Sequence, residues 1–366
     1  MYFALTDEQQ ELVRTVRSLV GKRAGSLDLR AAVATDPGYD EELWRALCEE
    51  IGAAALAVPE EYGGAGFSYL ETHLVLEELG AGLTPSPLLG SGVLATQALL
   101  LSGASDACRR LLPALADGSS RAALVWADTE GRWPLAGSGV TATPGEPWRL
   151  DGRATLVLDG VGADLLVVVA TTASGPGLFE VLPGHEGTAV AATPGVDLTL
   201  RFADVEFTGA PARLLTADAA ELLPRLRAVG AIATTALQTG AAQRALDLTV
   251  AYLKERVQFG RPLGSFQALK HRCAHMLVAV ETARSMSWAA AWSVANAQDT
   301  VERQAALAKS WCSDAFSMVA GEMVQLHGGI AITWEHDAHL YFKRAHATAQ
   351  LFGRAAEHRR ALIPQR

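Results

Sequence analysis

The sequence predicts a mainly α-helical protein with one small antiparallel β unit in its middle third. Apolar residues recur with the period of an α-helix in the first third of the 366 residues and again from about Ala217 to the end. Between these stretches, short runs rich in Val and Leu are separated by Gly, Pro and Asp, as in strands joined by turns. This order excludes a regular βαβ alternation. We expect an N-terminal helical domain (1–118), a central β domain (119–215) and a C-terminal helical bundle (216–366).

The N-terminal domain begins with a capping-box pattern. In Thr6-Asp7-Glu8-Gln9 the Thr6 hydroxyl and the Gln9 amide are placed to bond each other's backbone N–H. A glycine-rich segment, Val58–Ser68, is expected to be a loop. The remaining helices of this domain are expected at Glu41–Ile51, Tyr69–Leu79, Val93–Leu101 and Cys108–Leu115.

The other two domains are outlined by their apolar runs. Strands are expected at Ala122–Trp126, Leu156–Leu158, Leu165–Ala170, Val190–Ala192, Leu198–Phe202 and Val205–Phe207. Long helices are expected at Leu222–Gln258, Phe266–Asn296, Val301–Leu326 and His339–Leu362. At the first break in the bundle, Gly260 would end one helix, Pro262 would prevent its continuation and Ser265 would cap the next.

Composition narrows the class of protein. A hydrophobic content of 49% and a charged content of 19% are typical of a folded globular chain. A net charge of −9 argues against nucleic-acid binding, which needs a basic face. The four cysteines are scattered, so no disulfide framework is expected. With neither a signal peptide nor an apolar run of about 18 residues, we expect a cytoplasmic protein that does not enter a membrane.

Two glycine-containing segments carry candidate binding chemistry. The run Arg256–Gln267 reads RVQFGRPLGSFQ, and its structural interpretation is a turn between helices. It also brings guanidinium groups, which suit a pyrophosphate, next to Phe259, which suits a stacked base. The second segment, QLHGG at Gln325–Gly329, is either a helix C-cap or a place where a ligand approaches the backbone.

Two groups of residues look superficially like metal ligands. One consists of Glu335, His336, Asp337 and His339, and the other of His271 and His275, four residues apart on one helix. Neither group has a recognised zinc spacing such as H-E-x-x-H. We therefore expect solvated polar helix faces and no metal.

These segments together resemble one known family. VPEEYGGAGFSYLETHLVLEELGAG (58–82), RVQFGRPLGSFQ, QLHGG and TWEHDAHLYFKRA (333–345) follow one another as in the acyl-CoA dehydrogenases, and the resemblance covers nearly the whole chain. It implies the family's fold, which has an N-terminal helical domain, a central β domain and a C-terminal four-helix bundle. It also implies FAD and an acyl-CoA substrate, which members oxidise to the trans-2-enoyl-CoA before passing electrons to an electron-transfer flavoprotein. The segment 333–345 is most similar to a bacterial branch whose members often act on bulky CoA thioesters, including degraded steroid side chains.

The flavin site of this family is shared between subunits, and the resemblance assigns one half of it to seven residues. Arg256 is expected to pair with the pyrophosphate of a neighbour's FAD, and Gln325 and the glycines to lie beside the adenosine. The full set is Arg256, Gln258, Phe259, Gln267, Gln325, Gly328 and Gly329.

The other half of the flavin site, which a subunit builds for its own FAD, departs from the family pattern. The family's TEPxAGSD-like loop and WITNG-like strand correspond here to WADTEGRWPLAGSG (126–139) and TLVLDG (155–160). Leu156 and Leu158 then stand where the family has Trp and Thr. A leucine cannot supply a hydroxyl to the flavin ring.

The catalytic glutamate is also missing. Phe352 stands at one family position, and no Asp or Glu lies between Leu222 and Leu246, where other members carry the base. The nearest fallback candidates are Glu357 and Glu335. By resemblance, this is either a non-catalytic subunit that completes a catalytic paralogue's FAD site in an α₂β₂ heterotetramer, or a self-sufficient homo-oligomeric dehydrogenase with a displaced base. A binding or scaffold protein is the third hypothesis.

Overall fold

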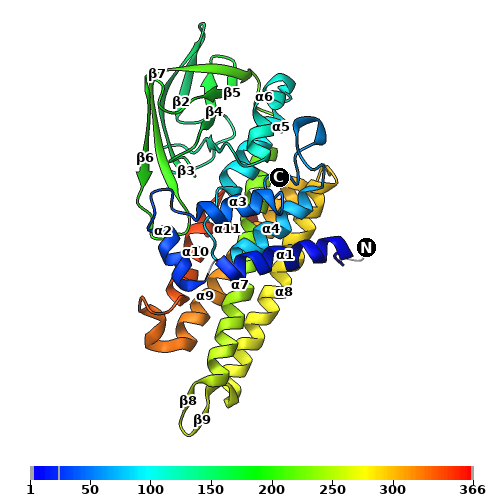
Figure 1. Cartoon of the computed structure of the whole chain (residues 1–366), viewed down its shortest axis with the longest axis vertical. Helices are drawn as coiled ribbons and strands as arrows, with labels where there is room; N and C mark the ends of the chain where they lie inside the picture. The colour runs from blue at the N-terminus through cyan, green and yellow to red at the C-terminus, as the bar shows by residue number, and fades with distance from the viewer. Residues whose placement is uncertain (1–3, 24, 364–366) are drawn as a thin grey trace. The chain divides into compact units, whose positions relative to one another are not determined.

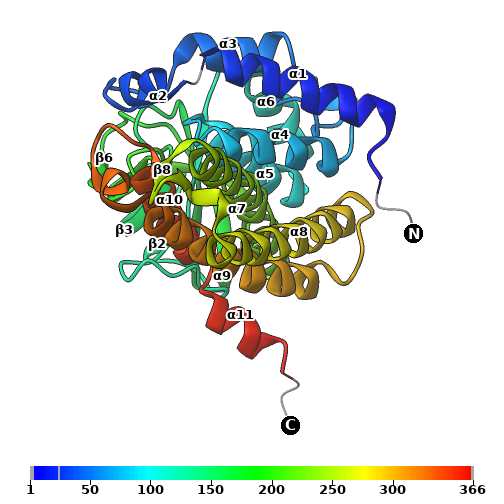
Figure 2. The same cartoon turned by 90° about the horizontal axis from the view of Figure 1, so that it is seen from below.

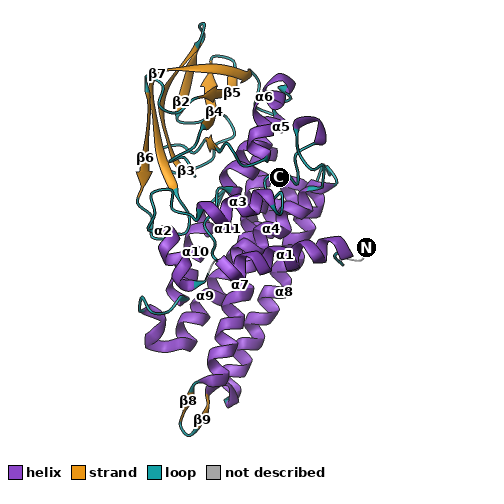
Figure 3. Cartoon of the chain, in the orientation of Figure 1, coloured by secondary structure: helices purple, strands orange, loops and turns teal. Residues whose placement is uncertain are grey.

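The computed structural model describes residues 4–23 and 25–363, which form two compact units. The helical unit comprises Met1–Ala31, His73–Thr84 and Ala231–Arg366. The mixed unit comprises Ala32–Thr72 and Pro85–Gly230. Figure 3 separates the helices of both units from the strands, which are concentrated in the mixed unit.

The helical unit is built around long helices that run side by side (Figures 1 and 2). Its core elements are α1 (Asp7–Arg23), most of α7 (Leu222–Glu255), α8 (Gln267–Ala295), α9 (Val301–His327), α10 (Ala338–Gln350) and α11 (Ala355–Ala361). Short elements join them, namely β8 (Val257–Gln258), β9 (Arg261–Pro262), η3 (Leu263–Ser265) and η4 (Gly328–Ile332). The helix α2 (Ser26–Val33) begins in this unit. The capping box is confirmed, since the Thr6 N–H donates to Gln9 Oε1 at 3.1 Å and the Gln9 N–H to Thr6 Oγ1 at 3.2 Å.

Glycine lets α7 cross α4 (Tyr69–Ala81) at very short range. A Cβ atom on Gly240 would lie 1.8 Å from the backbone oxygen of Glu77, and one on Gly80 would lie 2.4 Å from that of Leu237. Real Cβ atoms do not approach so closely, so both positions need glycine. The crossing sets the side chain of Glu77 beside α7.

The mixed unit contains a β-barrel and short helices. Its helical elements are α3 (Glu41–Glu49), η1 (Glu60–Tyr62), the π-helix η2 (Leu88–Ala95), α5 (Thr96–Leu101) and α6 (Ser105–Ala116). Its strands are β1 (Ala122–Val125), β2 (Val140–Thr143), β3 (Trp148–Leu158), β4 (Leu165–Thr172), β5 (Gly175–Val181), β6 (Thr188–Thr193) and β7 (Phe202–Thr216). The order β4-β2-β3-β7-β5 closes because β5 also pairs with β4, and inward side chains such as Leu150 and Phe179 fill the interior.

Several predicted strands and helices need correction. The sheet is mixed, because β4 runs parallel to both β1 and β2. Strands β2 and β5 were not expected, and of Leu198–Phe202 only Phe202 lies in a strand. The first third of the expected helix Val93–Leu101 belongs to the π-helix η2.

Two helices predicted for the C-terminal part also differ from those in the structure. The helix expected at Leu222–Gln258 ends at Glu255, and the one expected at His339–Leu362 is two helices, α10 and α11. The second break follows from Phe352 and Gly353, whose φ angles of 56° and 107° are incompatible with a continuous helix. The limits proposed for three domains remain a prediction. No helix in the described residues has the length and apolarity needed to span a membrane.

Candidate functional site

The first candidate segment forms an exposed hairpin at the end of α7. Phe259 and Gly260 have φ angles of 53° and 75°, as a tight two-residue hairpin turn requires, and β8 pairs with β9 around them. The Phe259 side chain is 87% exposed, and Arg261 lies 3.9 Å above the ring of Phe266. The predicted site residues Arg256, Gln258, Phe259 and Gln267 all lie on this surface.

Ser265 does not have the predicted capping role. Its hydroxyl donates to the Pro262 oxygen at 2.7 Å, and α8 begins after Phe266 without a side-chain cap. The hydroxyl therefore closes the turn that precedes the helix.

The second candidate segment lies at the end of α9 and is tied to the first. Gln325, Gly328 and Gly329 are exposed, and Gly328 has a φ of 66°. The ring of Tyr252, one helical turn before Arg256, stacks on His327 with centroids 4.4 Å apart. The Tyr252 hydroxyl also donates to the His327 oxygen at 3.3 Å. All seven predicted flavin contacts thus come from two neighbouring, solvent-facing segments of the helical unit.

The loop 126–139 of the mixed unit is folded onto the protein itself. Trp126 is buried and its indole N–H donates to the Pro134 oxygen at 2.9 Å. Asp128 accepts from the backbone N–H groups of Glu130 and Arg132, each at 2.9 Å. Thr155, on β3, donates to the Asp128 oxygen at 2.6 Å.

Neither of the two leucines on β3 presents a fully exposed surface on which a flavin ring could stack. Leu158 is 4% exposed, and Leu156 has a φ of 50° with its Cδ1 2.9 Å from where a Cβ on Gly131 would lie. Leu156 is therefore covered by the same loop. The segment expected to hold the chain's own isoalloxazine ring is therefore filled by the protein's own side chains and does not fit that ring, whereas the seven residues expected to contact a neighbour's FAD are exposed.

Phe352, which is expected at the family's base position, is a buried phenyl ring. Phe352 is 2% exposed, and its oxygen accepts a hydrogen bond from His358 Nε2 at 3.0 Å. The turn that carries it is held by Lys309, whose ammonium donates to the oxygens of Thr348 and Gly353 at 3.0 and 3.4 Å. Burial lowers the pKa of Lys309 to about 7.

The fallback bases Glu335 and Glu357 both lie on the surface. Glu357 Oε2 accepts from the Arg354 N–H at 3.3 Å and caps α11. A general base needs a substrate α-carbon held against it in an enclosed site, and neither carboxylate lies in one.

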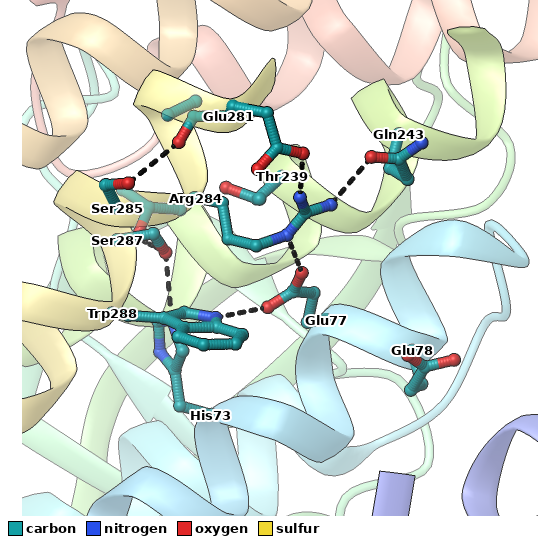
Figure 4. Close-up of polar contacts among 12 residues, drawn as sticks. His73, Glu77, Glu78, Thr239, Gln243, Glu281, Arg284, Ser285, Ser287 and Trp288 are labelled. Atoms are coloured by element: carbon teal, nitrogen blue, oxygen red, sulfur yellow. Dashed lines mark hydrogen bonds and ion pairs between the residues drawn. The ribbon is translucent and has the colours of Figure 1, made fainter. Parts of the chain in front are cut away.

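The structure contains a buried acidic residue, Glu77, that was not predicted from the sequence (Figure 4). Glu77 accepts from Arg284 Nε at 3.2 Å and from Trp288 Nε1 at 2.7 Å, and Arg284 also donates to Gln243 at 2.8 Å. Burial raises the pKa of Glu77 despite the guanidinium beside it. These side chains line a cavity of 850 Å³ within the helical unit. In the sequence, Glu77 is marked only as a charged residue within an apolar helix. Its partners Arg284 and Trp288 lie far along the chain, so no local pattern predicts the contacts.

Three residues of the first group that resembles metal ligands make other contacts. Asp337 pairs with Arg30 at 2.5 Å, His336 Nδ1 accepts from the Ala338 N–H at 3.1 Å, and His339 packs against Trp334. Within residues 4–23 and 25–363, no three His, Cys, Asp or Glu side chains are grouped as metal ligands would be.

Comparisons with known proteins agree with this architecture. Residues 6–119 match the family model for the acyl-CoA dehydrogenase N-terminal domain, and residues 225–365 match that for the acyl-CoA dehydrogenase C-terminal domain. The acyl-CoA dehydrogenase IpdE2 of Mycobacterium tuberculosis is 44% identical over 348 residues, 94% of this chain and 93% of the relative. IpdE2 of Mycolicibacterium smegmatis is 42% identical over 97% of this chain and 98% of the relative.

Among solved structures, the ChsE4–ChsE5 complex from Mycobacterium tuberculosis superposes with a TM-score of 0.90 at 32% identity, covering 100% of both chains. A variant of the Tcur3481–Tcur3483 steroid ACAD superposes with a TM-score of 0.89 at 34% identity, covering 97% of this chain and 96% of that one.

Proposed function

Because the chain belongs to the acyl-CoA dehydrogenase family, whose members are FAD-dependent oxidoreductases of the CH–CH bond, we propose that it is a non-catalytic subunit of a hetero-oligomeric dehydrogenase. The observation that carries the proposal is an asymmetry between the two halves of the flavin site. The half that would serve a neighbour is complete and exposed, with all seven predicted residues at the surface. The half that would serve the chain itself is covered by the loop 126–139.

The role of the exposed half is to complete an FAD site on a catalytic paralogue. When bound there, FAD would accept the hydride from the substrate's β-carbon. Arg256 offers a guanidinium fork to the pyrophosphate, and Phe259 offers an exposed aromatic face. Gly328 and Gly329 allow the adenosine side to approach the backbone closely, because neither has an atom within 4 Å of a Cβ added there.

The missing base is consistent with the same proposal, in which one subunit is non-catalytic and the other catalytic. A phenyl ring cannot remove the α-proton of an acyl-CoA, so the partner must supply the carboxylate. Similar proteins support a two-subunit assembly, since the ChsE4–ChsE5 structure is described as a complex and the Tcur3481–Tcur3483 protein as a steroid ACAD. We therefore propose an acyl-CoA with a bulky, steroid-derived acyl group as substrate. We place the assembly in the cytoplasm and propose an electron-transfer flavoprotein as electron acceptor.

The visible absorption spectrum tests this proposal. The chain purified alone should be colourless, and co-expression with a catalytic paralogue should give a yellow complex with about one FAD per pair of unlike chains. Arg256→Gln should lower the flavin content of that complex, whereas Arg303→Gln, an exposed arginine on α9, should not. A chain that is yellow alone and bleaches with an acyl-CoA would contradict the proposal. Calorimetry that detects neither FAD nor acyl-CoA binding, with or without a partner, would favour a scaffold protein.

One observation favours a second candidate, a self-sufficient dehydrogenase whose base is displaced to Glu77. This carboxyl is buried, has a raised pKa, and packs beside the stretch of α7 where other members carry their base. It also borders a cavity large enough for part of an acyl chain. In that case the chain alone would dehydrogenate an acyl-CoA, and Glu77→Gln would reduce kcat by orders of magnitude while the neighbouring Glu78→Gln would not.

A further inference from the structure

Three aromatic rings in contact connect the two exposed segments proposed to bind flavin. We call Tyr252, His327 and His336 the aromatic bracket. The His327 ring contacts both of the others, with centroids 4.4 Å from each and interplanar angles of 28° to Tyr252 and 49° to His336. Tyr252 precedes Arg256 by one turn, and His327 directly precedes Gly328, so the bracket joins α7 to the glycine turn.

Hydrogen bonds fix the protonation state of His327. The ring is 4% exposed, and its Nδ1 lies 2.8 Å from the Met323 oxygen. A carbonyl can only accept, so Nδ1 carries the proton. Nε2 is buried without a hydrogen-bond partner in the described structure. It therefore presents a bare lone pair inside the stack.

The outer ring of the bracket is also anchored. His336 Nδ1 accepts from the Ala338 N–H at 3.1 Å, which leaves its proton on Nε2. Arg30, on α2, holds the same turn through Asp337 at 2.5 Å and the Trp334 oxygen at 2.9 Å. These contacts hold in place the turn that carries His336.

A proton on His327 would be poorly accommodated. It would bury a charge and an N–H without an acceptor, beside a second imidazole. Burial and His336 together lower the pKa of His327, although the Met323 oxygen opposes them. Around His336, burial and Arg30 lower the pKa while Asp337 raises it. His339 and Lys343, on α10, and the Tyr252 hydroxyl, on α7, complete the titratable groups at the bracket.

We propose that His327 is a positioning residue, which holds the Gly328–Gly329 turn in place for a neighbouring subunit's flavin nucleotide and releases it when the aromatic bracket is protonated. The inference rests on the proposed function, because it assigns a regulation to the same exposed half-site. The flavin would be retained at neutral pH and lost in mild acid.

The direction of the pH effect follows from linkage. A depressed pKa in the closed bracket and an ordinary value of about 6.5 in the opened one mean that the opened bracket binds more protons as pH falls below about 6.5. The closed form is thus stabilised above that pH and loses its advantage below it. Carboxylates titrate mainly near pH 4, so a transition between about pH 5 and 6.5 reports histidine.

The test measures FAD release from the co-purified complex by the recovery of free-flavin fluorescence between pH 5 and 8. The wild-type release rate should rise by up to about tenfold from pH 7.5 to 5.5, because an imidazole with the ordinary pKa of about 6.5 is mostly protonated one pH unit below that value. His327→Phe keeps an aromatic ring in the stack but cannot titrate, so its profile should be flat over this range. His185→Gln, an exposed histidine of the mixed unit, should behave as the wild type.

The outcomes separate the two proposals. If His327→Phe does not fold, His327→Gln, which keeps an amide N–H for the Met323 oxygen but cannot titrate, should flatten the same profile. Unchanged acid release in whichever of these variants folds overturns the bracket, even when Arg256→Gln has confirmed the shared flavin. Flavin content insensitive to Arg256→Gln would instead overturn the shared site. Should the chain bind FAD as a homo-oligomer, the same profile is recorded on that assembly.

Discussion

Lys309 shows how one buried residue holds the turn that carries Phe352. Its side chain donates to Ser313 Oγ at 2.9 Å and to backbone oxygens at the end of α10 and in the turn beyond it. A cation at a helix C-terminus is favourable because the last carbonyls have no partner inside the helix. The lysine thus joins α9 to the segment that carries Phe352.

We expect Lys309→Met to destabilise the chain more at high pH than at low pH. The folded pKa of about 7 lies below the ordinary 10.5, so the unfolded chain binds more protons between these values and the wild-type free energy of unfolding rises with pH. The variant lacks this rise and leaves carbonyls unpaired, for a loss of about 2 kcal/mol at pH 9. Urea unfolding of the wild type and the variant at pH 6 and pH 9 measures their free energies of unfolding. Equal losses at the two pH values would show that Lys309 does not titrate in this range.

Glu77 illustrates what a single sequence leaves out at the residue scale. Glu77, Gln243, Arg284 and Trp288 come from three helices, and their contacts exist only after α4, α7 and α8 have packed. Local patterns report helix period, caps and turns, whereas a tertiary hydrogen-bond cluster leaves no spacing to detect. The residues proposed to contact FAD could be singled out from the sequence because they lie in two short, continuous segments.

At the element scale, the crossing of α4 and α7 gives a sharp test. Gly240→Ala should cost at least about 3 kcal/mol, because its Cβ would fall 1.8 Å from the Glu77 oxygen and the helices would have to separate. Gly321→Ala on α9 is the matched control. Nothing lies within 4 Å of a Cβ there, so alanine should add about 0.5–1 kcal/mol through its higher helix propensity. Thermal unfolding of the chain purified alone compares the two, and similar stabilities would contradict the close crossing.

The same scale explains which elements could be predicted. The start of α1 was set by a local capping box, and α7, α8 and α9 by their apolar period, so these elements lie close to where they were expected. Strand β5 was missed because its Gly175 and Gly177 obscure a strand pattern that pairing with β4 and β7 enforces. The break between α10 and α11 was missed because it depends on the positive φ of Phe352, which Lys309 and His358 hold from a distance.

At the scale of the whole molecule, exposed apolar side chains indicate that the helical unit is built to be covered. Val278, on α8, is 65% exposed, and Leu277, Trp311 and Ile332 of the same unit are also partly or largely exposed. Contiguous exposed apolar patches mark association surfaces, and we propose that these side chains belong to one. A shared flavin site needs such a surface, because the two subunits must stay together for FAD to be bound between them.

We therefore expect Val278→Glu to weaken assembly with the catalytic paralogue, since burying an unpaired carboxylate in an apolar interface costs several kcal/mol. Co-purification through a tag on the partner should fall about tenfold or more, which corresponds to about 1.4 kcal/mol. The flavin content should fall in proportion, because both subunits contribute to its site. Leu27→Glu is the control, as this residue is 82% exposed on α2 and its charge would remain in water if α2 lies outside the interface. Normal assembly of Val278→Glu with full flavin would place the interface elsewhere on the chain, whereas loss of assembly by both variants would extend it to α2.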